Sequence, residues 1–167
     1  MRRAARSLQA VFANGRDDGA REDMALASLF GGMALANAGL GAAHGLAGPI
    51  GGMFSAPHGA ICAALLPHVM QANLRALRLR QPASPALGRY QTVARLLTGK
   101  PQAGADEGAE WVRWLVSDFQ IPGLAVYGIK GEDAAEIAGK AAQASSMKAN
   151  PIVLTPEEIR AVVEAAL

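Results

Sequence analysis

The feature that most constrains this chain is a long stretch without charge. Among the 167 residues, the 51 residues from Met24 to Leu74 include no Asp, Glu, Lys or Arg. Charged side chains are almost always left at a protein surface, so a stretch without them is expected to be largely buried. Its many Ala and Gly residues permit close contact between helices. We therefore predict a buried helix pair at the centre of the domain.

A membrane span is the alternative interpretation of the same stretch. The segment from Met24 to Ala43 is long enough, because about 20 apolar residues cross a bilayer. However, Ala and Gly outnumber Leu, Ile and Val in it, it contains Asn37, and no belt of Arg and Trp marks its ends. We expect no membrane interaction.

Overall composition points to one compact domain in a reducing compartment. The formal net charge is +2, and the arginines are scattered without a basic run, so nucleic-acid binding is not indicated. The single cysteine, Cys62, forms no internal disulfide. The start of the chain is rich in arginine but lacks the apolar core of a secretory signal. We expect a cytoplasmic protein.

Apolar residues recur at helical spacing along almost the whole chain, which predicts an all-α fold, a helical bundle. A kink or break is expected at Pro67, and the run Thr155-Pro156-Glu157-Glu158 is a capping box that starts the last helix. The glycines at 31, 32, 39 and 41 weaken the second helix, so a neighbouring backbone is expected to approach it closely. Helices are expected at about 2–13, 20–46, 57–80, 84–97, 106–119, 132–144 and 156–166.

His44 and His58 lie among glycines and apolar residues with no charged residue nearby. Neutral imidazole is the commonest metal ligand. The two histidines are 14 residues apart, so they converge only if the turn marked by Gly48-Pro49, Gly51-Gly52 and Pro57 folds their helices side by side. From spacing alone, a metal or catalytic site and a pair of helix-end histidines bonded to backbone carbonyls remain equally open.

Two imidazoles form an incomplete site, because a catalytic metal takes about three protein ligands and keeps one open position. His68, which follows Pro67, is expected to support the site from outside or to cap a helix. Cys62 lies one turn after His58 and is expected to be a small core residue. The missing ligands are therefore expected from outside this chain.

Three runs of sequence carry a resemblance to a known family. They are ANAGLGAAHG (36–45), GGMFSAPHG (51–59) and ALLPHVMQAN (64–73). The flanking runs AREDM (20–24) and MKANP (147–151) agree with them. Together they resemble the iron-containing (group III) alcohol dehydrogenases, and the resemblance extends over essentially the whole chain.

The resemblance implies a fold, a metal and a reaction. Members have an N-terminal dinucleotide-binding domain and a C-terminal all-helical domain of the dehydroquinate synthase-like type, which this chain matches as one portion over residues 1–167. One aspartate and three histidines hold a divalent metal, Fe²⁺ or Zn²⁺, and His44 and His58 match the last two histidines. The reaction is hydride transfer between a small alcohol or aldehyde and NAD(P). The other two ligands and the NAD(P)-binding domain are expected upstream of Met1, so no catalytic or cofactor-binding residue is assigned here.

Two positions depart from the family pattern. Gly48 stands where many members have another histidine, and Cys62 stands where they usually have asparagine. A member related to the maleylacetate reductases therefore remains an alternative. A non-catalytic helical module that forms a homodimer or pairs with a complementing N-terminal chain is another. We expect the isolated chain to be inactive as a dehydrogenase.

Overall fold

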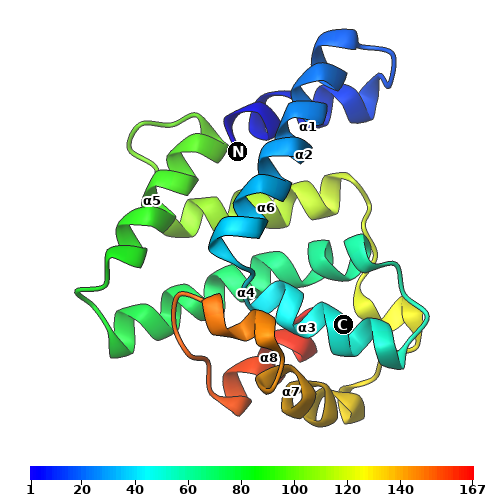
Figure 1. Ribbon diagram of the computed structural model, residues 1–167, viewed down its shortest axis with the longest axis vertical. Coiled ribbons are helices and arrows are strands. Elements are labelled where there is room, and N and C mark those ends of the chain that lie inside the picture. Colours follow the sequence, from blue (N-terminus) through cyan, green and yellow to red (C-terminus); the bar gives the residue numbers. More distant parts are fainter.

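The computed structural model describes residues 1–167 and is helical, without β-strands (Figure 1). This confirms the predicted all-α class. Short 3₁₀ segments η1 (Leu124–Tyr127), η2 (Gly131–Asp133) and η3 (Ser145–Ala149) connect the later helices. The helices are α1 (Arg2–Ala13), α2 (Asp18–Ala38), α3 (Ala42–Met53), α4 (His58–Arg80), α5 (Pro85–Thr98), α6 (Ala105–Asp118), α7 (Ala134–Ala142) and α8 (Pro156–Ala165).

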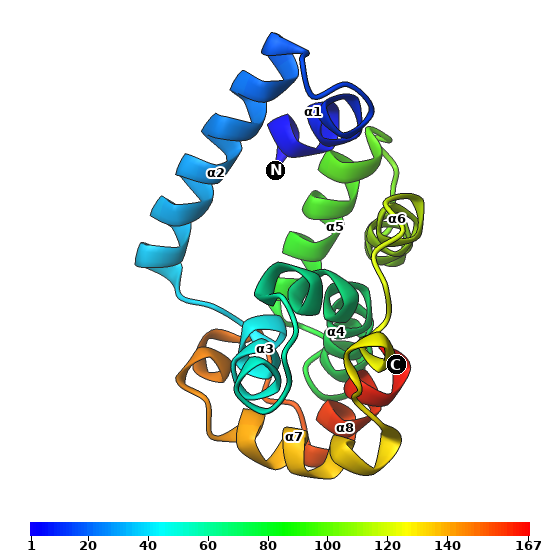
Figure 2. The ribbon, with the colours of Figure 1, turned by 90° about the vertical axis from the view of Figure 1, so that its right-hand side faces the viewer.

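The main core lies where α3 and α4 pack with α7 and α8, in the lower half of Figure 2. Each of these helices contributes aliphatic side chains that are inaccessible to solvent. Burial of one large aliphatic side chain stabilises the fold by about 1.5–3 kcal/mol. The predicted capping box is present at α8, where Thr155 and Glu158 bond each other's backbone amides. The fully buried side chains include Leu46, Ile50, Ile61, Leu65, Leu77, Ile137, Ile159 and Val163.

The helices α5 and α6 pack closely and cover the other side of α4. At their crossing, a Cβ added to Gly108 would lie 2.9 Å from the Cβ of Ala94 and 3.0 Å from its Cα. Met70 of α4 packs there with Ala109 and Val112 of α6 in a small second cluster. A residue without a side chain at position 108 therefore sets the distance between α5 and α6.

The helices α1 and α2 form a hairpin held by Asp23. Its carboxylate accepts hydrogen bonds from Ser7 Oγ, Arg6 and Arg3, at 2.5–2.8 Å. The Ser7 hydroxyl, and then the Arg6 guanidinium, lower the pKa of Asp23 from 3.8 to about 2. Asp23 therefore stays ionised and fixes the angle at which α2 leaves α1.

Most of α2 lies in solvent, so the prediction of a buried helix pair is wrong for this half of the uncharged stretch. Figure 2 shows α2 running apart from α5, and residues 28–39 are all exposed. The prediction assumed a partner along the whole of α2 within the chain, whereas in the structure α2 packs mainly with α1. No atom lies within 4 Å of a Cβ added at Gly31 or Gly32, so the expected close backbone approach does not occur there. The buried half of the uncharged stretch consists of α3 and of α4 up to Leu74.

The predicted helix 20–46 is in fact two helices, α2 and α3, which meet at an angle of 97°. The break lies at Gly39, whose φ of +73° is in the region that favours glycine. Beyond it, the Asn150 side chain accepts a hydrogen bond from the amide of Ala42 and so caps the new helix. No single helix is long and apolar enough to cross a membrane; α2 and α3 reach that threshold only when taken together across their bend.

Neither Pro49 nor Pro67 ends a helix. The turn expected over 48–57 is helical in its first part, because α3 continues through Pro49 to Met53, and α4 continues through Pro67 to Arg80 without a break. An internal proline costs about 3 kcal/mol or more, and the complete burial of Ile50 and Leu65 beside these prolines offsets that cost. The turn between α3 and α4 is therefore confined to residues 54–57.

Candidate metal centre

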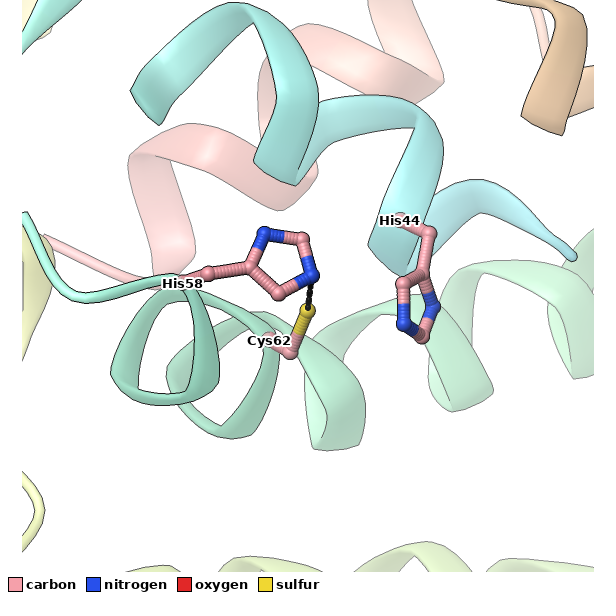
Figure 3. A group of neighbouring side chains, drawn as sticks. All are labelled: His44, His58 and Cys62. Carbon is pink, nitrogen blue, oxygen red and sulfur yellow. Dashed lines mark hydrogen bonds between the residues drawn. The ribbon is translucent and has the colours of Figure 1, made fainter. Parts of the chain in front are cut away.

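His44 and His58 lie side by side where the start of α3 faces the start of α4 (Figure 3). His44 is in the first turn of α3, and His58 is the first residue of α4. Their ring centroids are 5.5 Å apart, with an angle of 49° between the ring planes. The structure therefore brings the two histidines together, with a connection between their helices that is shorter than the expected turn.

Cys62 joins the two histidines. Its Sγ lies 3.5 Å from His58 Nε2, and one donor atom from each of His44, His58 and Cys62 lies within 4.8 Å of the others. Cys62 also packs against the hydrophobic core, as expected of a small core residue, but its sulfur faces the imidazoles (Figure 3). The i, i+4 spacing from His58 on one helix was the signal in the sequence that could have placed it in the site.

The site favours neutral side chains. Partial burial, and then the neighbouring His58, lower the pKa of His44. Burial raises the pKa of the Cys62 thiol. A neutral imidazole presents an unprotonated nitrogen, which is the form that binds a metal. The pair is therefore set up to accept a cation without first losing a proton from His44.

An amide network fixes the start of the helix that carries His44. Asn150 Oδ1 accepts from the amide of Ala42, two residues before His44, and Asn150 Nδ2 donates to Asn73 Oδ1 and to the carbonyl of Ile152, both at 2.7 Å. Asn73 Nδ2 in turn donates to Asn150 Oδ1 and to the Tyr90 hydroxyl. Sequence reasoning missed Asn73 and Asn150 as positioning residues, because their spacing of 77 residues carries no local pattern.

His68 lies outside the cluster. It projects from α4 ten residues after His58, into a separate hollow that Arg75, Arg78 and Glu158 also line. Burial, and then the nearby Arg113, lower the pKa of His68. His68 is therefore not brought to the other two histidines.

The donor set fits a divalent transition metal. Two imidazole nitrogens and a sulfur are the ligands that zinc and its first-row neighbours take, whereas magnesium and calcium require oxygen. No carboxylate belongs to the cluster. The exposed His58 ring leaves the site open on one side. A cation here would thus have protein ligands on one side and space for further ligands on the other.

Comparison with known proteins gives the family. The family model described as Fe-containing alcohol dehydrogenase family, C-terminal, matches residues 1–167. Alcohol dehydrogenase 4 of Saccharomyces cerevisiae is 34% identical over 161 residues, which is 96% of this chain and 40% of that protein. The 1,3-propanediol dehydrogenase of Klebsiella pneumoniae is 36% identical over 172 residues, which is 99% of this chain and 42% of that protein.

Comparison with solved structures gives the same family. The crystal structure of a 1,3-propanediol oxidoreductase matches with a TM-score of 0.88 at 34% identity, over 99% of this chain and 43% of that one. An alcohol dehydrogenase from Oenococcus oeni gives 0.87 at 31% identity, over 99% and 43%. The chain belongs to the Fe-containing alcohol dehydrogenase family and corresponds to the C-terminal domain, as the sequence motifs indicated. It spans about two fifths of the length of these relatives.

Proposed function

We propose that this chain is the helical, metal-holding part of an NAD(P)-linked dehydrogenase that interconverts a small alcohol and its aldehyde. The convergence of His44 and His58 at the facing starts of α3 and α4 is the observation that carries this proposal. The family membership supports the reaction class. Hydride transfer then requires a nucleotide-binding domain in addition to residues 1–167.

In this proposal, His44 and His58 each give one ring nitrogen to Fe²⁺ or Zn²⁺. A divalent cation held there supplies Lewis-acid polarisation of the alcohol or carbonyl oxygen. His44 is kept in position by the cap that Asn150 places on α3. Neither histidine acts as the base or accepts the hydride, because the ring nitrogen that faces the site is used for binding.

The exposed face of α2 supports a further contact. Leu29, Phe30 and Met33 are 55–58% exposed on one face of a helix that packs mainly with α1 in this chain. Exposed apolar patches of this kind mark interaction surfaces. We propose that this face packs against the polypeptide that carries the nucleotide-binding domain, which would also supply the remaining metal ligands. A homodimer through the same face is the competing outcome.

A chimeric enzyme tests the proposal. The part of the Klebsiella pneumoniae relative that this chain does not match is fused to Met1, and NADH formation from 1,3-propanediol is followed with and without a chelator. Chelator-sensitive activity that His44→Ala and His58→Ala each abolish, and that His68→Ala retains, supports the proposal. NADH formation by residues 1–167 alone would contradict it.

A further inference from the structure

We propose that Cys62 is a third ligand from this chain to the metal that His44 and His58 hold, so that the chain offers a two-histidine, one-cysteine donor set that favours zinc over ferrous iron. The inference rests on the proposed metal site and goes beyond it by naming a further ligand and the preferred metal. Three side chains from two adjacent helices then hold the ion on the side of this chain, and its other side stays open to further ligands.

The spacing of the donors matches this coordination. Two ligands of a tetrahedral zinc, one sulfur at about 2.3 Å and one nitrogen at about 2.0–2.1 Å, lie roughly 3.6 Å apart. Cys62 Sγ and His58 Nε2 are 3.5 Å apart. The His44 donor lies within 4.8 Å of both, so closing the set requires a movement of about an ångström. Side-chain rotation of the half-buried His44 ring provides that movement.

The helix register directs the thiol to the site. Side chains on an α-helix tilt toward its N-terminus, and residues four apart lie on one face. Cys62 therefore points back over the first turn of α4 toward His58, and Figure 3 shows the sulfur beneath the His58 ring on the side of His44. Helical ligand pairs at i, i+4 are an established zinc arrangement.

Charge and softness favour the same conclusion. The cluster contains no carboxylate, so sulfur is the group within it that can bring negative charge to a cation. As the sulfur–metal bond forms, the thiol proton leaves to solvent, and the thiolate lowers the charge of a dication by one. Thiolate ligands select zinc, and the stability order of divalent ions places zinc and cobalt above ferrous iron and manganese for such a donor set.

The alternative role for Cys62 is an outer partner that orients His58 without touching the metal. Loss of an outer partner costs about 10–100-fold in metal affinity, and loss of a direct ligand costs more. Only a direct ligand gives a sulfur-to-metal charge-transfer absorption when Co²⁺ replaces zinc. These two readouts separate the roles without an activity assay.

The test titrates the purified full chain with Co²⁺ and then with Zn²⁺, followed by absorption. We expect a sulfur-to-cobalt charge-transfer band in the near ultraviolet for the wild type and for the control His68→Ala. Cys62→Ser should lose this band, retain the visible bands of bound cobalt, and bind Zn²⁺ more than about 100-fold more weakly. The charge-transfer band is measured on the wild-type protein itself, so this part of the test does not depend on whether the Cys62→Ser variant folds.

Two outcomes would overturn the inference, and they are distinguishable. If wild-type protein binds cobalt without the charge-transfer band, or if Cys62→Ser binds zinc within about threefold of wild type, Cys62 is not a ligand and the two-histidine site stands. If neither metal binds the wild-type chain, or if His44→Ala leaves binding unchanged, both the ligand role of Cys62 and the proposed histidine site are wrong.

Discussion

The side-chain amides of Asn73 and Asn150 face each other across α4 and the segment that precedes α8, in a reciprocal pair with N···O distances of 3.2 and 2.7 Å. The same Asn150 oxygen accepts from the amide of Ala42 at the start of α3. One side chain thus joins the C-terminal segment to the helix that carries His44. The orientation of His44 depends on residues that are distant in the sequence.

Asn150→Ala should destabilise the fold. The substitution leaves the side chain of Asn73, which is 2% exposed, without its main partner and removes the cap of α3. An unsatisfied buried polar group costs about 1–3 kcal/mol in the free energy of unfolding. Urea denaturation of the metal-free chain measures this. Asn37→Ala, which removes an exposed amide that bonds only within α2, is the matched control and should change stability by less than about 0.5 kcal/mol.

Gly108→Ala should separate α5 from α6. The added methyl group would lie 2.9 Å from the Cβ of Ala94, and such overpacking costs about 1–3 kcal/mol. Gly139→Ala is the control, because its Cβ would contact nothing within 4 Å on an exposed face of α7. That change should stabilise the chain by about 0.5–1 kcal/mol. Thermal unfolding of both variants gives the comparison; equal effects would contradict the close helix contact.

The α1–α2 hairpin should weaken in acid. The pKa of Asp23 falls from 3.8 to about 2 on folding, so its contribution is fully present above pH 3.8 and is lost as pH falls toward 2. Amide hydrogen exchange in α1 and α2 between pH 4 and 2 should therefore accelerate beyond the intrinsic pH dependence. Asp23→Asn should remove this extra acceleration. If amide exchange in Asp23→Asn accelerates in acid as much as in the wild type, other carboxylates cause the acceleration.

The apolar face of α2 should be replaceable without loss of stability. Phe30→Glu with Met33→Glu alters side chains that are 55% and 56% exposed, so unfolding of the isolated chain should shift by less than about 0.5 kcal/mol. Copurification with a nucleotide-binding domain should be lost. Val126→Glu, at a 72% exposed position on η1, should leave that association intact. A large loss of stability in the double variant would show that α2 already has a partner within the chain.

The helices with strong amphipathic patterns were predicted well from the sequence. The bounds of α1 match the prediction, and those of α5 to α8 lie within about two residues of it. The predictions for the uncharged stretch were less accurate, because it has no contrast between polar and apolar faces. The break at Gly39 depends on the distant Asn150, and the passage of α3 through Pro49 depends on tertiary burial of Ile50. Neither dependence is a local property of the sequence.

The site was partly predictable for a similar reason. His44 and His58 are conspicuous in an uncharged, glycine-rich setting, and their convergence needed only two helices side by side. Cys62 was harder to assign, because a half-buried thiol packs as well as it coordinates, and only the distance of 3.5 Å between its Sγ and His58 Nε2 shows which way it faces. Asn150 was not predictable as a positioning residue, since the two partners that tie it to other helices, Asn73 and Ala42, are 77 and 108 residues away.

Zinc binding to the purified chain, measured by isothermal titration calorimetry, is the direct test of the metal centre. We expect one Zn²⁺ per chain for the wild type and for His68→Ala. We expect no measurable binding for the double variant His44→Ala, His58→Ala, since Cys62 alone cannot hold the ion. Wild-type affinity in that double variant would contradict the assignment of this histidine pair as the metal centre.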